Sequence, residues 1–349
     1  MANEDPKIEE QDTSSPIEEL QKRMEDIEMS IGVFNPRNLA GLRDKDLSQA
    51  TRANLFGDGS DGDVVVSTEI NLAKDMFYNN LTVESGGIIN TKSFRIFVKD
   101  QFIKKPGGIV RNSGNNGAVG TTVGGAGGTA IASGSLPGGL AGGAGGYGYG
   151  TAQDGFDGID AAKSLGSAGS GGGGGGNGIP GSGWRGGAGG DGGSQTGTIF
   201  NIINSFSSAY YLIDILPTIV AMTISAGSGG GGGGGAPNSF ASGGGAGSTG
   251  AMIWIAANRM FIEGTTEIRC NGGNGGNGAA PWHTSDGGGG GGAGAPGGVI
   301  ILIYGEKTGT GTLSVAGGSG GTGGTATNGY PGSPGTAGQT GKTYLIQIA

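Results

Sequence analysis

The sequence lacks most of the residues that crosslink a fold, bind metals or perform catalysis. It has one cysteine, Cys270, and one histidine, His283, so it can form neither an internal disulfide nor a cluster of histidine and cysteine ligands. Only 14% of its residues are charged, unlike a charge-rich disordered chain. Hydrophobic residues make up 34%, too few for a conventional core along 349 residues. We therefore expect a repetitive protein with thin cores and no catalytic site, metal site or cofactor.

No segment of the chain is basic. The net charge is −8, and acidic residues outnumber basic ones by 12 to 7 in residues 1–56, 7 to 6 in 57–105 and 9 to 7 in 106–349. A protein that binds nucleic acid needs clustered lysine and arginine to neutralise phosphates. The charge distribution thus argues against nucleic acid as a partner.

Signals for export and for membrane insertion are also missing. Polar and acidic residues follow Met1, unlike the basic and apolar start of a signal peptide. The longest apolar stretch, 198–225, contains Asp214 and Pro217, which favours a buried or partner-facing segment over a membrane span. We expect a protein made in a cytoplasm, without a membrane span.

Glycine is the residue present in excess. Residues 106–349 hold 80 of the 87 glycines, whereas the whole chain has only 12 prolines, which excludes collagen. Several tracts place glycine at every third position, the period of an extended polyproline-type helix that polyglycine can also adopt. The clearest tracts are 139–148, 186–193 and 317–323. Without Cβ atoms such tracts can pack closely and bond to one another. The alternative is disordered glycine loops.

A repeat unit joins these tracts to β-strands. Residues 266–276 and 311–321, 45 positions apart, both alternate apolar and polar residues and end in GGxGG. Looser copies are 109–117 and 222–230, and apolar runs recur at 94–98, 252–255, 299–304 and 344–348. One short strand pair cannot bury its own apolar face, but stacked units can. We predict an all-β protein with a repetitive β-solenoid-like or layered body and polyglycine II-type glycine tracts.

The N-terminal residues differ from this body. A heptad seam predicts a short coiled-coil helix over 16–34, with Ser15 as its cap and Pro16 at its first position. The seam consists of Ile17, Leu20, Met24, Ile27, Ile31 and Phe34. Isoleucine at both seam positions favours more than two strands, which predicts a homotrimer. The alternative is a single amphipathic helix lying on its own domain. We divide the chain into an N-terminal anchor (1–56), a β domain (57–117) and a glycine-rich repeat body (118–349).

Four stretches carry a resemblance to known proteins. They are LSQATRANL at 47–55, GDGSDGDVVVS at 57–67, DMFYNNLTV at 75–83 and SFRIFV at 93–98. They resemble glycine-rich tail-fibre and spike proteins of tailed bacteriophages, and the glycine tracts are similar to the polyglycine bundle of T-even-type tip adhesins. The general character of the sequence is similar over 45–349, and the specific sequence similarity is confined to 57–117. The heptad helix has no counterpart in those adhesins.

The resemblance implies a structural protein of the virion. Such a protein would be a fibre, a spike or a capsid or tail decoration that projects from the particle and contacts a glycan or protein on the host surface. Residues 1–56 would then bind other virion proteins. Two other functions stay open. One is a polysaccharide-degrading tailspike-type enzyme that uses Asp154, Asp157 and Asp160. The other is a non-viral extracellular matrix or ice-binding protein.

Aromatic residues in glycine loops, with their neighbours, are the candidate receptor contacts. They are Tyr147, Tyr149, Trp184, Arg185, Trp282 and His283. Exposed aromatic rings can stack on the faces of sugars or anchor a protein surface. The alternative is that they fill gaps between subunits or tracts.

Overall fold

A computed structural model describes residues 55–148, 164–167, 171–175, 186–192, 225–227, 240–264 and 268–348. The chain divides into two compact units, Met1–Arg52 and Ala53–Ala349, and the described residues all belong to the second. The predicted helix 16–34 and its six seam residues lie outside the described ranges. Within these ranges the protein consists almost entirely of parallel strands and extended glycine tracts.

The larger sheet has six parallel strands in the order β1-β3-β5-β9-β11-β13. Their bounds are Gly62–Val66 (β1), Met76–Val83 (β3), Ile96–Lys104 (β5), Met252–Ile262 (β9), Val299–Thr308 (β11) and Lys342–Gln347 (β13). Three strands come from the predicted β domain and three from the glycine-rich body. One row of residues crosses four strands in register: Ile96, Ile255, Leu302 and Leu345.

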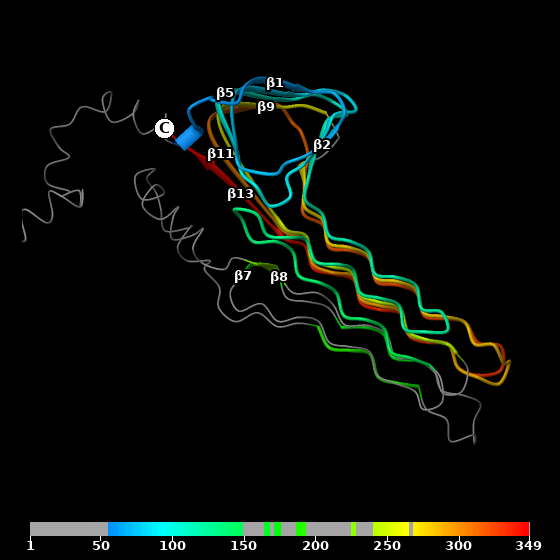
Figure 1. Cartoon of the computed structure of the whole chain (residues 1–349). Helices are drawn as coiled ribbons and strands as arrows, with labels where there is room; N and C mark the ends of the chain where they lie inside the picture. The colour runs from blue at the N-terminus through cyan, green and yellow to red at the C-terminus, as the bar shows by residue number, and fades with distance from the viewer. Residues whose placement is uncertain are drawn as a thin grey trace, which may run out of the picture. The chain divides into compact units, whose positions relative to one another are not determined.

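The smaller sheet has five short parallel strands in the order β12-β10-β6-β4-β2. Their bounds are Glu69–Asn71 (β2), Ile88–Asn90 (β4), Ile109–Arg111 (β6), Ile268–Arg269 (β10) and Leu313–Ser314 (β12). Along the chain, strands alternate between the two sheets, so each turn of the backbone adds one strand to each (Figure 1). The pairing of Ile268 with Leu313 confirms the 45-residue repeat.

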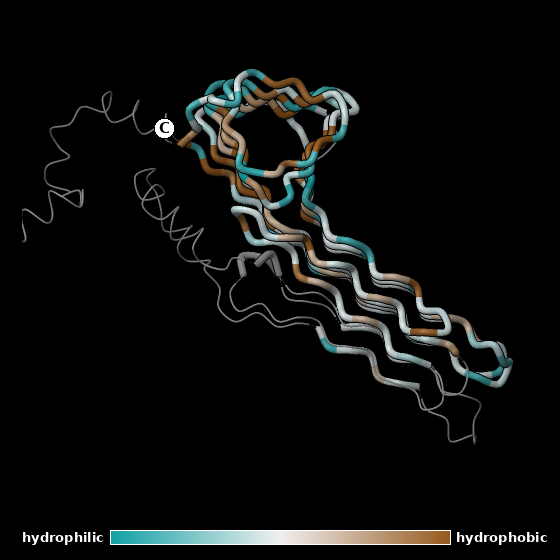
Figure 2. Tube along the Cα trace, in the orientation of Figure 1, coloured by the Kyte–Doolittle hydropathy of each residue, from teal (hydrophilic) through white to brown (hydrophobic). Residues whose placement is uncertain are grey.

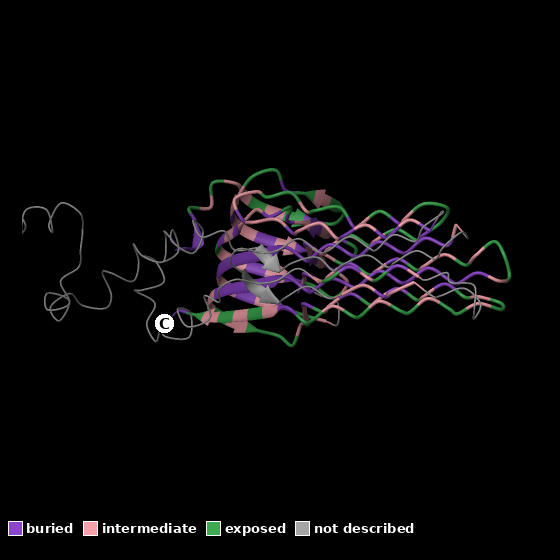
Figure 3. Ribbon diagram, turned by 90° about the horizontal axis from the view of Figure 1, so that it is seen from below, coloured by how far each residue is buried: buried purple, intermediate pink, exposed green. Residues whose placement is uncertain are grey.

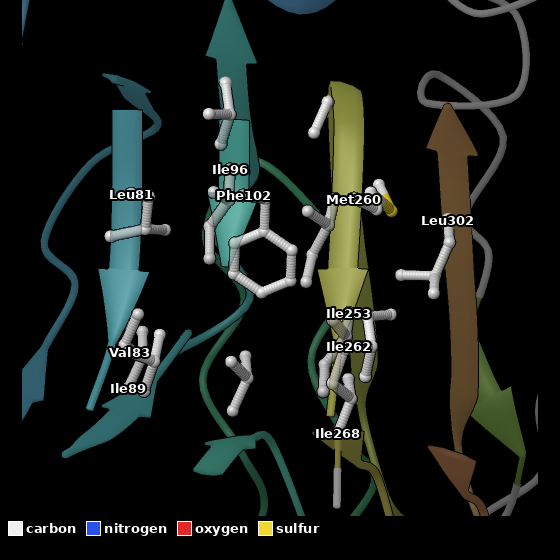
Figure 4. Close-up of a cluster of buried hydrophobic side chains, with 14 of the residues drawn as sticks. Leu81, Val83, Ile89, Ile96, Phe102, Ile253, Met260, Ile262, Ile268 and Leu302 are labelled. Atoms are coloured by element: carbon white, nitrogen blue, oxygen red, sulfur yellow. The ribbon is translucent and has the colours of Figure 1, made fainter. Parts of the chain in front are cut away.

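One apolar core fills the space between the sheets. Inward-pointing residues of each strand are buried, as in β3, where Leu81 and Val83 alternate after an irregularity that separates them from buried Tyr78. Phe102 of β5 and Met260 of β9 meet in the middle of this cluster (Figure 4). Cys270, which occupies the same position as Val315 in the 45-residue repeat, lies in the same core and is fully buried.

A second core covers the opposite face of β9 and β11. Trp254 and Ile301, neighbours across the two strands, pack there with Leu55, Phe56 and Leu136. Because both faces of the first parts of these strands are buried, residues 252–257 and 299–303 are unbroken apolar runs rather than alternating ones. Leu55 and Phe56 are helical, and Gly57 after them has the left-handed backbone (φ 82°) that commonly ends a helix.

Glycine tracts leave the sheets after β6, β10 and β12 and return to β9, β11 and β13 (Figure 1). Tract 287–298 shows how they are joined. The N–H groups of one third of its residues donate to tract 330–339, at Gly288, Gly291, Gly294 and Gly297. The N–H groups of the residues that follow these, Gly289, Gly292, Ala295 and Gly298, donate to tract 270–279. Carbonyl groups of the last third accept from tract 244–250, at Gly290, Ala293 and Pro296. The three-residue period thus aims successive residues at three different neighbours.

Close packing explains why these positions are glycine. A Cβ atom on Gly292 would overlap the carbonyl oxygen of Gly245, and one on Gly275 would overlap that of Gly292. Residues 241–251 and 286–298 are buried without a break although they include almost no large side chain, and Figure 3 shows buried segments along the tracts. The described tracts are therefore ordered by backbone hydrogen bonds within one chain.

One predicted repeat copy does not join the stack. Residues 225–227 of the copy 222–230 form β8 (Ser225–Gly227), which pairs with β7 (Ser164–Ser167) in a separate two-stranded sheet. The copy 109–117 does join, because its strand β6 pairs with β10. Apolar residues in β10 and β6 point into the core, whereas β8 reads Ser-Ala-Gly and has no large apolar side chain to contribute.

Candidate binding surface at the ends of the glycine tracts

Three described turns connect glycine tracts at the end away from the sheets (Figure 1). They span 119–123, 281–286 and 325–330. Backbone hydrogen bonds shape them: Thr121 N–H donates to Val123, and Asp286 N–H donates to the carbonyl of His283 at 3.1 Å. The second and third turns are tied together because Asn328 N–H donates to the carbonyl of Thr284 at 2.7 Å. These turns are therefore held on an ordered support.

Apolar side chains are concentrated on these turns. Six large apolar side chains are exposed in the described part of the chain, and four of them lie here. They are Val119 (55% exposed), Val123 (56%), Trp282 (73%) and Tyr330 (52%). The ring of Phe240 lies 5.4 Å from that of Trp282, at 47° to it. Since exposed aromatic and apolar side chains drive recognition, this tip cluster is a candidate binding surface.

The predicted contact residues have different outcomes. Trp282 and His283 are exposed neighbours in one turn, as a binding role requires. Tyr147 is half-buried in a tract, next to Gly148, whose N–H donates to Ser242 Oγ at 3.1 Å. Tyr149, Trp184 and Arg185 lie outside the described residues. Sequence reasoning missed Val119, Val123, Phe240 and Tyr330, although each lies at the end of a glycine tract, which is a usable signal.

Asp286 adds a buried acceptor to the tip. Its side chain is 2% exposed, and its Oδ1 accepts a 3.3 Å hydrogen bond from Ser285. Its Oδ2 has no hydrogen-bond partner in the described part of the chain. The turn therefore presents an exposed indole and an exposed imidazole, whereas the carboxylate of Asp286 is buried beneath the surface. This combination suits binding through stacking and hydrogen bonding.

The aspartates near the start of the sheets form hydrogen bonds to nearby backbone and side-chain groups. Asp58 accepts from Ser60 N–H at 2.9 Å, and Asp63 accepts from the amides of Asn79 and Asn80 at 2.7 and 2.9 Å. Asp61 accepts from Phe77 N–H at 2.7 Å, and this bond is the main reason that its pKa lies below the usual value. Asp58, Asp61 and Asp63 thus have the hydrogen bonds of a capped turn.

The remaining sequence candidates are carboxylates and possible metal ligands. Asp154, Asp157 and Asp160, the carboxylates of the enzyme hypothesis, lie outside the described ranges. Among the residues with a described position, no three histidine, cysteine, aspartate or glutamate side chains gather as metal ligands. The same part of the chain contains no helix long and apolar enough to cross a membrane.

Comparison with known proteins identifies no similar protein. No protein-family model, no curated protein and no solved structure matches the chain.

Proposed function

We propose that the protein is a structural component of a virus particle, a fibre, spike or decoration, whose glycine tracts present the tip cluster to a host surface. The concentration of exposed apolar side chains on turns at the tract ends carries this proposal. Exposing apolar side chains to water is unfavourable, and burying them against a partner removes this free-energy cost. The function is display and binding without turnover.

The finer architecture belongs to the same proposal. The strands that alternate between two parallel sheets wind as a β-solenoid, and the tracts with a three-residue period are polyglycine II-type helices. Neighbouring tracts hold one another on three sides, as in tract 287–298, so the turns need little further ordering when a partner binds.

The N-terminal residues supply assembly in this proposal. The helix 16–34 forms a coiled coil that sets the register of a homotrimer, and residues 1–56 attach to other virion proteins. Three copies would present three tips, so weak single contacts would add to a strong multivalent one. Light scattering of the full chain and of a chain starting at Gly57 tests this: we expect a trimer that dissociates on truncation, and a full-length monomer would contradict it.

Cell binding tests the tip cluster. Fluorescently labelled full-length protein is titrated onto a panel of bacterial strains with different surface glycans and outer proteins, and bound protein is measured by flow cytometry. We expect saturable binding to a subset of strains. Trp282→Ala with Tyr330→Ala should weaken it at least tenfold, because hot-spot aromatic residues carry most of the binding energy.

The matched control is Leu345→Ala, which removes an exposed apolar side chain (49%) from β13 instead of the tip. It should bind as the wild type does. Equal binding by the tip variant and the wild type would contradict the assignment of the tip cluster. Binding to no strain in the panel would contradict the host-contact function.

A further inference from the structure

A polar groove lies beside the smaller sheet, where β6 continues into its glycine tract. Its volume is about 870 Å³, within the range of roughly 300–1,000 Å³ typical of small-molecule sites. One wall is the outer face of the smaller sheet, and the other is the returning segment 130–132. The side chain of Asn115, itself in the lining, bonds to Thr129 O at 2.9 Å and links the two walls. The groove is thus formed by residues that are distant in sequence.

A row of polar side chains crosses the floor of this groove. Asn71, Asn90, Arg111 and Arg269 are neighbours in register on β2, β4, β6 and β10. Three of them form a connected ladder: Asn90 Nδ2 donates to Asn71 Oδ1 at 2.9 Å, and Arg111 Nε donates to Asn90 Oδ1 at 2.6 Å. Hydrogen bonds therefore fix the side chains on the β2 side of the row.

Arg269 breaks this ladder. It is half-buried and lines the groove, yet its side chain makes no hydrogen bond or ion pair within the described part of the chain, although its backbone carbonyl accepts from Asn112 N–H at 3.1 Å. Its cross-strand neighbour is Arg111, and like charges directly opposite each other are destabilising. Glu69, the only carboxylate among the described lining residues, already accepts from Arg111 Nη2 at 2.8 Å. An anion placed beside Arg269 would relieve this repulsion.

The charge of the groove contrasts with that of the chain. Its lining holds Lys92, Arg111 and Arg269 against Glu69 alone, while the chain carries −8. Glu267 lies two positions before Arg269 and outside the described residues. If it is added to the lining, the three cations still outnumber the two carboxylates. A net positive groove in an acidic protein attracts anionic ligands selectively.

The backbone beside the groove is strained. Lys92 and Ser93 have φ values of 49° and 62°, the left-handed region that residues other than glycine rarely adopt. Asn112 Nδ2 donates to Ser93 Oγ at 3.2 Å and to Met252 O at 2.9 Å, which helps to hold this turn. Such strain persists where the surroundings enforce it and often marks binding sites. Here it brings Lys92 to the groove.

We propose that this groove binds a saccharide that carries a carboxylate or phosphate group. The planar guanidinium of Arg269 would pair with the anionic group in a bidentate manner. The amides of Asn71 and Asn116 would bond to sugar hydroxyls, and Ile131 on the opposite wall would contact the apolar face of a sugar ring. The site lies at the sheet end of the tracts and does not depend on the function proposed for the tip cluster.

Calorimetric titration of the full chain with matched probes tests the proposal. The probes are trigalacturonate, glucose 6-phosphate, the uncharged trisaccharide maltotriose and inorganic phosphate. At least one charged sugar should bind ten times more tightly than both maltotriose and inorganic phosphate. Binding should weaken several-fold when the salt concentration rises, because the pairing is ionic. The two charged sugars distinguish a carboxylate from a phosphate site.

Two arginine variants complete the test. Arg269→Gln should weaken binding of the preferred sugar at least tenfold. Arg259→Gln, the matched control, removes an arginine that is paired with Asp100 outside the groove, and it should change binding less than twofold. Equal affinity for maltotriose, equal affinity for inorganic phosphate, or unchanged binding by Arg269→Gln in a variant with a wild-type thermal unfolding curve would each overturn the proposal.

Discussion

The sheets and the glycine tracts solve the problem of a stable interior in opposite ways. In the sheets, large apolar side chains such as Phe102 and Met260 fill the space between the two layers. In the tracts there is almost no side chain, and backbone groups bond directly to backbone groups. Figure 2 shows apolar residues concentrated in the sheets and much rarer along the tracts. The sheets should therefore be sensitive to the loss of side-chain atoms, and the tracts to their addition.

Removing a large side chain from the sheet core should have the largest effect. Phe102 is fully buried among β5, β9 and their neighbours. Phe102→Ala should reduce the free energy of unfolding by about 3–5 kcal/mol, because it loses burial and leaves a cavity. Phe102→Leu, which keeps most of the volume, should cost roughly 1 kcal/mol. Guanidinium unfolding followed by circular dichroism measures both, and equal losses for the two variants would contradict the packing argument.

Adding one methyl group to a tract should have the next largest effect. Gly292→Ala places a Cβ against the carbonyl oxygen of Gly245, and backbone cannot move aside as a side chain can. We expect a loss of about 1–3 kcal/mol. The control is Gly174→Ala, where the nearest atom to the new Cβ, Gly187 O, lies 3.6 Å away. This change should be neutral within about 0.5 kcal/mol or slightly stabilising. Comparable losses at both positions would show that packing does not select glycine here.

These contrasts explain which features the sequence could predict. The 45-residue offset predicted the register of β10 and β12, because each alternating run must turn its apolar residues toward one core. The three-residue glycine period predicted the bonding of the tracts. The prediction that the copy 222–230 belongs to the repeat stack was wrong, because its strand β8 pairs with β7 in a separate sheet. A similar pattern does not place a strand in the core when it lacks large apolar residues.

The sites were harder to predict than the repeats. The exposure of Trp282 and His283 could be predicted, because a large side chain in a glycine loop has no local core to join. Val119 and Tyr330 were missed because a single apolar residue in a turn carries no pattern of its own. The groove was invisible for a different reason: Asn71, Arg111 and Arg269 become neighbours only through strand pairing across 198 positions of sequence, from 71 to 269.

A buried ionisable group sharpens the comparison at alkaline pH. Burial in the sheet core, with a smaller effect of the Asp61 charge, raises the pKa of Tyr78 to about 12. In the unfolded chain the phenol ionises near pH 10. Between these values the unfolded state binds fewer protons than the folded state, so stability falls as pH rises. Between pH 8 and pH 11.5 the denaturant midpoint of unfolding should decrease more for the wild type than for Tyr78→Phe. Parallel decreases would contradict the burial effect.

The smallest effect concerns the edge of the tracts. Inside the bundle, N–H groups bond to carbonyls of a neighbouring tract, but an exposed tract lacks such a neighbour on one side. Asparagine side chains take this place: Asn271, Asn274 and Asn277 accept from the N–H groups of Ala316, Ser319 and Thr322, each 45 positions later. The GGN repeat therefore marks the surface of the bundle, as uninterrupted glycine marks its interior.

Asn274→Ala should lower the free energy of unfolding by about 0.5–1.5 kcal/mol, the net value of one such hydrogen bond. The lower half of this range applies, because Asn274 and Ser319 are exposed and water can replace the amide. Asn274→Asp separates bonding from size, since a carboxylate also accepts from Ser319 N–H, and it should retain most of the stability. Ser319→Ala, which keeps the N–H group, should have almost no effect. If Asn274→Asp and Asn274→Ala unfold at the same denaturant concentration, the asparagines are spacers rather than hydrogen-bond acceptors.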